Sequence, residues 1–369
     1  MTRIELRDVT KYFHITTPES ETADPPDNPP VQDNTDPTKI FAIENLNLVV
    51  PNNRILVILG PSGCGKSTLL RLIAGTMPVD SGEILFNGVD MANTPPRDRN
   101  IGMVFQNYAL YPHQTSKQNI LSYFSFREKT TELDAEAKEK YQRTSELMGV
   151  DIKHLLGRKP GTLSSGEQQR VAIARCITRN PQLFLMDEPF SNLDQKLRDR
   201  YRIQLKRLLR EFRVTTIYVT HDQQVALSLA DQIAVMNKGR IEQVGPPHRI
   251  YHLPENLFVA DFLSFDQDTP AINLLTGETI REDLRGKTVG VRPEEIVITQ
   301  EQADDSIQGR VVDIQSAFPK KEVVVSVNVA GQVLRTKLDE NSGLELYHNV
   351  WVHFNAYHVF NKKSGRRVG

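Results

Sequence analysis

Apolar and polar positions divide the chain into segments with the periodicity of strands and of helices. Residues 3–13 alternate apolar and polar side chains as a half-buried strand does, and residues 40–50 are predicted to pair with them. Continuous apolar runs at residues 54–60, 182–187 and 215–220 are typical of strands that are buried on both faces. Because helix-forming stretches separate these runs, the pattern predicts an α/β core with a parallel sheet.

Three segments depart from this alternation. Residues 82–91 carry an Asn-Gly pair between apolar positions, which indicates an antiparallel hairpin. Residues 107–161 are predicted to form a helical subdomain, most clearly in the helix-forming run at residues 131–150. Residues 14–39 are rich in Pro, Asp, Glu and Thr and nearly free of large apolar side chains. We interpret them as a flexible, solvated insertion, with a regulatory or docking loop as the alternative.

The pattern changes again past residue 265. Residues 306–315, 321–338 and 349–360 alternate with period two and show little helix. They predict a separate β-rich domain, built as a small barrel. We therefore divide the chain into residues 1–245, the α/β domain, and residues 246–369, the β-rich domain.

Composition narrows the class of protein only slightly. The chain has 369 residues, room for two or three domains, and its net charge of −1 gives no sign of a nucleic-acid-binding surface. The two cysteines, Cys64 and Cys176, lie far apart, so a disulfide framework is not expected and a reducing cytosol fits. The N-terminal segment lacks a signal-peptide pattern, and no apolar run reaches the roughly 18–20 residues of a membrane span.

One loop carries strong chemical information. Residues 60–67 match the pattern G-x-x-x-x-G-K-[ST] between an apolar strand and a predicted helix. Such a loop wraps a phosphate chain with its backbone N–H groups, Lys66 reaches the β- and γ-phosphates, and the Ser67 hydroxyl ligates Mg²⁺. The predicted phosphate-binding residues are Gly60, Pro61, Ser62, Gly63, Cys64, Gly65, Lys66, Ser67 and Thr68.

Polar residues at the ends of other apolar strands complete a candidate hydrolytic site. Asp187 and Glu188 follow a buried strand, where Asp187 can hold Mg²⁺ through water and Glu188 can orient or deprotonate an attacking water. His221 follows another strand, and its position favours a contact with the γ-phosphate. Gln106 follows a third and can touch the metal or the water.

A second phosphate-favouring helix start lies about a hundred residues after the loop. Residues 163–170 (LSSGEQQR) place two hydroxyls and a glycine directly before a helix-forming run. Free backbone N–H groups at a helix N-terminus favour anions. The chain thus has two such places far apart in sequence.

These motifs, in this order and spacing over residues 1–245, resemble the ATP-binding cassette (ABC) ATPases. The resemblance implies an α/β P-loop NTPase fold with an antiparallel β subdomain and a helical subdomain. It implies ATP and Mg²⁺ as ligands and a head-to-tail dimer in which Ser164, Ser165 and Gly166 contact the partner's ATP. Residues 191–194 would line the dimer seam, with Asp194 near the nucleotide, and Phe13, or else Tyr12, would stack on adenine.

Residues 163–167, which we call the signature stretch, depart from the family's usual signature sequence, Leu-Ser-Gly-Gly-Gln. Ser165 and Glu167 occupy its third and fifth places. Serine still offers an N–H if the backbone there does not need a conformation reserved for glycine. Glu167 adds a negative charge close to phosphate, which the first turn of a helix tolerates. The insertion at residues 14–39 is a second departure from the family pattern.

Residues 99–113 and 289–296 resemble the ATPase subunits of bacterial importers for sugars, polyamines, sulfate or iron, most closely the carbohydrate branch. This resemblance implies a C-terminal all-β, OB-like regulatory domain and a homodimer at the cytoplasmic face of the cell membrane. It also implies transmembrane permease partners, received by the loop after Gln106 and the helical region, and indirectly a solute-binding protein.

Two other readings stay open. The first is a soluble, non-transport ABC ATPase, although the chain has neither the long coiled coils nor the second cassette that those proteins typically carry. The second makes the C-terminal domain a binding module for RNA or an oxyanion. The lysines at 320–321 and the basic residues at 362–367 are short runs without interleaved aromatics, so no nucleic-acid partner is expected.

Overall fold

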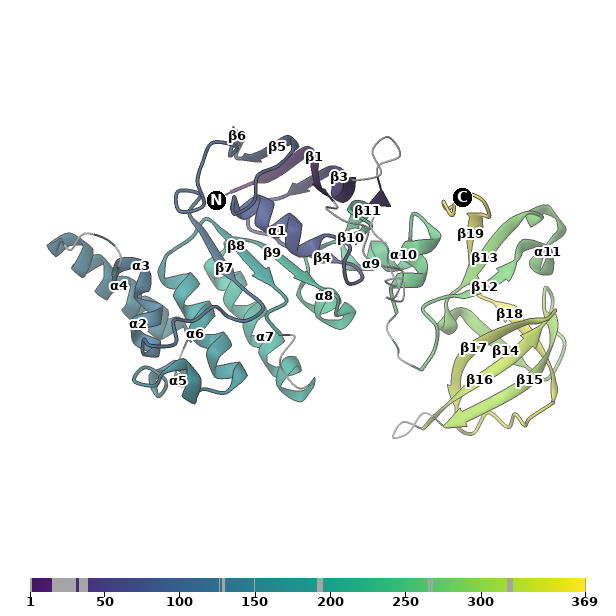
Figure 1. The fold of residues 1–369 in the computed structure, drawn as a ribbon. Helices are drawn as coiled ribbons and strands as arrows, with labels where there is room; N and C mark the ends of the chain where they lie inside the picture. The colour runs from purple at the N-terminus through teal and green to yellow at the C-terminus, as the bar shows by residue number, and fades with distance from the viewer. Residues whose placement is uncertain are drawn as a thin grey trace, which may run out of the picture. The chain divides into compact units, whose positions relative to one another are not determined.

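The computed structural model describes residues 2–14, 31–32, 39–125, 127, 130–148, 150–190, 195–264, 266, 268–316 and 321–368. The chain forms two compact units, residues Met1–Pro247 and His248–Gly369. Figure 1 shows the elements of each unit. Among the described residues no helix combines the length and apolar character needed to cross a membrane.

The core of the first unit is a six-stranded sheet with the order β11-β10-β4-β9-β8-β7. Five of the strands are parallel, as the apolar runs predict, and β11 pairs antiparallel with β10 at one edge. Every residue of β4, β8 and β9 is buried, because helices cover both faces. The strands are β4 Ile55–Leu59, β7 Ile101–Val104, β8 Leu183–Asp187, β9 Thr215–Thr220, β10 Gln232–Asn237 and β11 Arg240–Gly245.

An antiparallel sheet with the order β2-β3-β1-β5-β6 lies over helix α1 (Figure 1). One hydrophobic core joins its buried face, α1 and the core sheet. The predicted pairing of the first strand with residues 40–50 is confirmed, and the Asn-Gly pair forms the turn of the β5–β6 hairpin. The elements are β1 Ile4–His14, β2 Val31–Gln32, β3 Lys39–Val50, α1 Lys66–Ala74, β5 Ser81–Phe86 and β6 Val89–Asp90.

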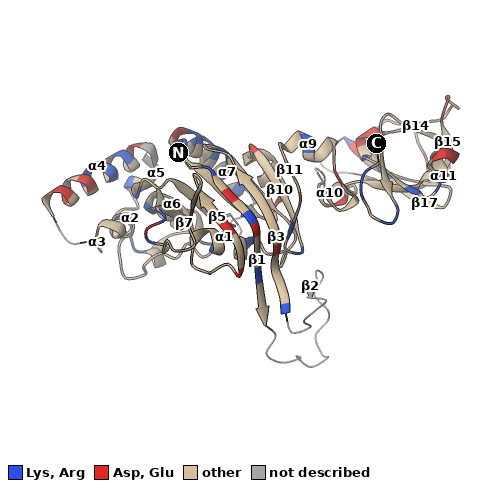
Figure 2. Cartoon of the chain, turned by 90° about the horizontal axis from the view of Figure 1, so that it is seen from above, with Lys and Arg blue, Asp and Glu red and all other residues tan. Residues whose placement is uncertain are grey.

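A helical subdomain with its own small core follows β7, as the sequence predicts. Its helices begin at Ser116 rather than at residue 107, because residues 107–115 form turns and the Thr115 side chain caps the first helix. Acidic and basic residues are interspersed along α4 (Figure 2). The elements are α2 Ser116–Ile120, α3 Ser122–Ser125, α4 Thr131–Met148, α5 Val150–Lys153 and η1 Pro160–Thr162.

Three further helices complete the first unit: α6 Ser165–Thr178, α7 Gln195–Phe212 and α8 Gln223–Leu229. Helix α6 joins the helical subdomain to the sheet, since its side chains Val171 and Ala174 belong to the subdomain core. Both cysteines of the chain are free and buried, as a protein without disulfides requires.

The second unit is β-rich, as the period-two alternation predicts, and its strands form two antiparallel sheets. One has the order β12-β13-β19 and the other β14-β18-β15-β16-β17, and an apolar core of the unit draws on strands of both sheets. The strands are β12 Asn273–Thr276, β13 Lys287–Val291, β14 Ile296–Thr299, β15 Ile307–Ser316, β16 Glu322–Val329, β17 Gln332–Asp339, β18 Asn349–Phe354 and β19 His358–Asn361. Short helices α9 Pro247–His252, α10 Leu257–Phe262 and α11 Gly277–Ile280, and the 3-10 turns η2 Glu282–Leu284 and η3 Pro293–Glu295, complete it.

A buried arginine anchors the helices of the second unit to its strands. Arg292 donates hydrogen bonds to the carbonyl oxygens of Ala260 at 2.8 Å, Leu263 at 3.0 Å and Tyr251 at 3.1 Å, and also to Ala271. Its guanidinium lies 4.0 Å from the centre of the Tyr251 ring. Four carbonyl acceptors compensate the cost of burying this charge.

The insertion needs one correction at its boundaries. His14 and Lys39 are paired residues of β1 and β3, and Val31 and Gln32 pair with β3 as the short strand β2. The predicted flexible segment of residues 14–39 therefore includes positions held by strand pairing. Its remaining residues, 15–30 and 33–38, lie outside the described part of the chain.

Candidate functional site

Parallel strands end at the same edge of the core sheet, and the predicted site residues follow them. In the β4–β9 pair Leu59 lies opposite Thr220, and neighbouring β8 ends at Asp187. The phosphate loop begins directly after Leu59, and His221 follows Thr220. The carboxyl edge of a parallel sheet therefore brings together Gly60 and His221, which are 161 positions apart in the sequence.

The phosphate loop joins β4 to α1, and its shape depends on glycine. Gly65 has a φ of 105°, and a Cβ atom there would lie 2.4 Å from the carbonyl oxygen of Ala42. The next residue, Lys66, begins α1 and is 7% exposed. Its Nζ donates to the carbonyl oxygens of Gly60 and Pro61, both at 2.9 Å. An ammonium and a helix N-terminus thus meet at one place, which favours a phosphate group.

A cavity of about 630 Å³ opens beside this loop. Its described lining is Phe13, Ile40, Phe41, Ala42, Ser62, Gly63, Gly65, Lys66, Ser67, Thr68, Gln106, Glu188, His221, Lys238 and Gly239. Among the predicted phosphate-loop, strand-end and aromatic residues, Tyr12, Gly60, Pro61, Cys64 and Asp187 do not line it. Gly60, Pro61 and Asp187 instead contact Lys66 or Ser67 from behind the cavity wall.

Strand β1 decides which aromatic ring faces the cavity. Phe13 lines the cavity and is 45% exposed, as a ring that receives a flat ligand must be. Successive strand residues point to opposite faces, so Tyr12 points the other way. Its ring packs edge-on against Phe41, with ring centres 6.4 Å apart, and the Nζ of Lys39 lies 4.8 Å from its centre.

Asp187 and Ser67 form a pair of oxygen donors at the base of the site. The Ser67 hydroxyl donates to Oδ1 of Asp187 at 2.9 Å. Burial of Asp187, which is 8% exposed, raises the pKa of its carboxyl, and the hydrogen bond from Ser67 opposes that rise. An alcohol and a carboxylate oxygen are the donors that Mg²⁺ prefers. Among the described residues, no group of three or more His, Cys, Asp or Glu side chains is placed to hold a metal ion. A cation at Ser67 and Asp187 would therefore also need water or phosphate ligands.

Glu188 and His221 form a second, separate pair. Nδ1 of His221 lies 3.0 Å from both Oε1 and Oε2 of Glu188. Glu188 has a φ of 43°, in the left-handed region, so the backbone turns sharply directly after β8. Because a carboxylate oxygen accepts, the contact selects the imidazole form with a proton on Nδ1. The site thus separates a carboxylate that pairs with a hydroxyl from one that pairs with an imidazole.

The sequence prediction missed five cavity residues: Ile40, Phe41, Ala42, Lys238 and Gly239. The first three begin β3 beside Phe13, and the last two form the β10–β11 turn. The backbone N–H of Gly239 donates to the carbonyl of Cys64 at 3.0 Å, so the turn is tied to the phosphate loop. The Lys-Gly turn signal was present in the sequence, but only tertiary pairing places it here.

The second helix start forms as predicted but does not line this cavity. Ser164 caps α6, and its hydroxyl accepts from the backbone N–H of Glu167 at 3.4 Å. Ser165 is the first residue of α6, so its backbone needs no conformation reserved for glycine. Ser164, Ser165 and Gly166 thus stay apart from the phosphate loop within one chain. The predicted seam, residues 191–194 with Asp194, lies outside the described residues.

Comparison with known proteins places these motifs in context. Residues 43–191 match the family model described as ABC transporter. The chain is 41% identical over 349 residues to the sn-glycerol-3-phosphate import ATP-binding protein UgpC of Bartonella bacilliformis, covering 89% of this chain and 95% of that protein. It is 43% identical over 279 residues to the xylose/arabinose import ATP-binding protein XacK of Haloferax volcanii, covering 70% and 71% respectively.

A solved structure shares the fold. It is the dimeric structure of an ATP-binding cassette in a post-hydrolysis state bound to ADP and Pi. The match has a TM-score of 0.51 at 29% identity and covers 66% of this chain and 98% of that chain. The likeness therefore extends over about the length of the first compact unit.

Proposed function

The chain belongs to the ABC transporter ATPase family, and from this premise we propose that it is the ATP-hydrolysing subunit of an importer for a sugar or a glycerol phosphate. The observation that carries the proposal is the carboxyl edge of the core sheet, where the phosphate loop, the Ser67–Asp187 pair and the Glu188–His221 pair meet. The importer and its solute class rest on relatives that act on sn-glycerol 3-phosphate and on xylose or arabinose.

ATP occupies the 630 Å³ cavity in this proposal. The N–H groups of the phosphate loop and the Lys66 ammonium bind the β- and γ-phosphates, and Phe13 stacks on the adenine ring. Ser67 and Asp187 hold Mg²⁺, with Gln106 at the edge of the same cavity. When bound, the cation neutralises charge on the phosphate oxygens.

Hydrolysis then needs a base and a means of orienting water. Glu188 lines the cavity and accepts a proton from water as the water oxygen attacks the γ-phosphorus and ADP leaves. His221 holds the Glu188 carboxylate in place through its Nδ1 and also lines the cavity, within reach of the γ-phosphate. The two side chains act as one unit.

A second copy of the chain completes each site. Ser164, Ser165 and Gly166 present a helix N-terminus that this chain's own cavity does not use. A head-to-tail homodimer brings that turn to the ATP held by the other copy, with Asp194 in the seam. The solved ATP-binding cassette whose fold this chain shares is dimeric, which supports this arrangement.

Coupling to transport requires a membrane partner. We place the subunit at the cytoplasmic face of the cell membrane, docked to permease subunits through the loop after Gln106 and the helical subdomain. A solute-binding protein would deliver the solute on the other side. The β-rich C-terminal domain, which the sequence division assigns to residues 246–369, acts as the regulatory domain.

The test is capture of the intact complex. The Glu188→Gln variant is purified from detergent-solubilised membranes with ATP and Mg²⁺, and the co-purifying proteins are identified by mass spectrometry. We expect a multi-span permease, whose companion binding protein then leads to the solute. Recovery of soluble proteins alone, with the variant folded and loaded with ATP, would overturn the importer assignment in favour of a non-transport ATPase.

A further inference from the structure

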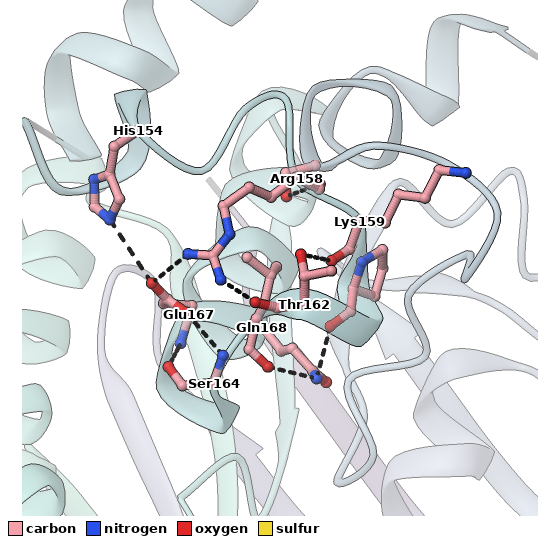
Figure 3. Close-up of polar contacts among 10 residues, drawn as sticks. His154, Arg158, Lys159, Thr162, Ser164, Glu167 and Gln168 are labelled. Atoms are coloured by element: carbon pink, nitrogen blue, oxygen red, sulfur yellow. Dashed lines mark hydrogen bonds and ion pairs between the residues drawn. The ribbon is translucent and has the colours of Figure 1, made fainter.

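A carboxylate lies in the first turn of the helix that the proposed function assigns to nucleotide binding. Oε2 of Glu167 accepts a hydrogen bond of 2.7 Å from the backbone N–H of Ser164, and the Ser164 hydroxyl accepts from the N–H of Glu167. This reciprocal capping box fixes the start of α6. It also turns the carboxylate back toward the residue that precedes the helix (Figure 3).

A cation from the preceding segment contacts the same carboxylate. Nη1 of Arg158 lies 3.1 Å from Oε1 of Glu167, and Nε2 of His154 lies 3.8 Å from that oxygen. The Arg158 guanidinium also donates to the carbonyl oxygen of Thr162, so both of its Nη atoms are engaged (Figure 3). The Glu167 side chain is only 17% exposed, and these partners enclose it.

These contacts keep Glu167 ionised. The hydrogen bond from Ser164 and the charge of Arg158 lower the pKa of its carboxyl, against the opposing effect of burial. A negative charge therefore sits within one turn of the backbone N–H groups of Ser165 and Gly166. An uncompensated charge there would repel a phosphate that approaches those groups.

We infer that Arg158 is a positioning residue for the signature turn of α6: it holds and neutralises Glu167, so that the turn can receive the partner copy's ATP although it carries a carboxylate. This inference rests on the proposed function. It requires that Arg158 matter through Glu167, and not merely through the fold of its own loop. The distinction is necessary because the Arg158 guanidinium also donates to the carbonyl oxygen of Thr162, a contact that does not involve Glu167.

The experiment is a double-mutant cycle on the full-length chain, with steady-state hydrolysis of MgATP as the readout. The variants are Arg158→Gln, Glu167→Gln and the two combined. Glutamine at position 167 keeps the capping-box acceptor and removes the charge. We expect Arg158→Gln to raise the KM for ATP by about fivefold in the wild-type background, the size of a contact coupling, with a smaller change in kcat.

In the Glu167→Gln background the same Arg158→Gln change should leave the KM within about twofold, because the charge that needs compensation is gone. The fivefold effect should also shrink as ionic strength rises from low values to about 0.5 M, since the pair is partly exposed to solvent. Lys159→Gln is the matched control. It removes one positive charge from the adjacent, exposed position, whose side chain points away from Glu167, and should not change the KM (Figure 3).

An equal rise in KM in both backgrounds would overturn the inference and give Arg158 a role in the loop alone. A matching rise in Lys159→Gln would overturn it too, because the effect would then be one of general charge. Thermal unfolding of each variant separates a loss of fold from a change in KM. Failure of the ATPase assignment looks different, because the wild-type chain itself would then neither bind nor hydrolyse ATP.

Discussion

Nδ1 of His221 lies 3.0 Å from both carboxylate oxygens of Glu188, across the ends of the neighbouring strands β8 and β9. The contact joins residues 33 positions apart and faces the cavity beside the phosphate loop. It fixes the orientation of the carboxylate before any substrate arrives. Pre-organisation of this kind is what a general base requires, since its reach to the proton is decided by tenths of an ångström.

Replacing Glu188 with Gln should separate ATP binding from ATP hydrolysis. The amide keeps the size of the side chain and its contact with His221 but cannot accept a proton, so turnover should fall by about 10²- to 10⁴-fold. The affinity for ATP should stay within about twofold, because the phosphate loop is untouched. Steady-state phosphate release and equilibrium binding of a fluorescent ATP analogue measure the two effects.

Glu83→Gln is the control for this variant, because Glu83 is an exposed carboxylate on β5 outside the cavity lining. It should hydrolyse ATP at the wild-type rate. Normal turnover by Glu188→Gln would remove Glu188 from the role of base.

Replacing Lys66 with Ala should weaken nucleotide binding itself. The ammonium is buried in the loop, and a hydrogen bond from a charged donor contributes about 1.5–3 kcal/mol, which corresponds to a roughly 10- to 150-fold rise in the Kd for ATP. Isothermal titration with ATP and Mg²⁺ measures the change. An unchanged Kd in a variant with an unaltered Tm would contradict the assignment of residues 60–68 to phosphate.

Phe13 and Tyr12 offer an internal comparison for the adenine ring. Phe13 lines the cavity, whereas Tyr12 packs against Phe41 and Lys39. Phe13→Ala should raise the Kd for ATP by about tenfold through lost stacking, and Tyr12→Ala should change it far less. Inorganic triphosphate lacks the base, so its affinity should be the same for Phe13→Ala and wild type. A larger loss for Tyr12→Ala would transfer the stacking role to that residue.

The second unit should lose stability in mild acid through His358. Burial first, and then the charges of Arg367, Arg292 and His252, lower the pKa of this imidazole from an ordinary 6.5 to about 4. The unfolded chain therefore binds a proton between these values that the folded chain does not. The free energy of unfolding should thus be highest above pH 6.5 and fall as the pH drops toward 4.

His358→Gln is the variant that checks this dependence, because glutamine stays polar and does not titrate in this range. Its Tm should vary less between pH 7 and pH 4.5 than that of the wild type, as measured by differential scanning calorimetry on the transition of the second unit. Equal slopes for both proteins would show that His358 does not titrate across that range.

The two unusual residues of the signature stretch, Ser165 and Glu167, differ in whether local structure is enough to explain them. A Ser at position 165 is explained by local structure, since it is the first residue of α6 and has ordinary helical backbone. Glu167 is not explained in that way. The capping box with Ser164 could be predicted from spacing, but the contact with Arg158 depends on how the 3-10 turn at residues 160–162 returns the chain to α6.

The sequence by itself determined the phosphate loop, the strand–helix alternation around it and the identity of Asp187, Glu188 and His221 as strand-end residues. These features are local: consecutive N–H groups, glycines and one lysine make the loop, and apolar runs mark buried strands without any knowledge of their neighbours.

Only the tertiary structure decided which of these residues meet. The register of β8 and β9 pairs Glu188 with His221, the fold brings Ser67 to Asp187 over 120 positions, and the pleat of β1 turns Phe13 rather than Tyr12 to the cavity. The turn at Lys238 reaches the site only because β10 pairs with β4. Spacing along a chain cannot fix such contacts, since strand order and register depend on the packing of a whole sheet at once.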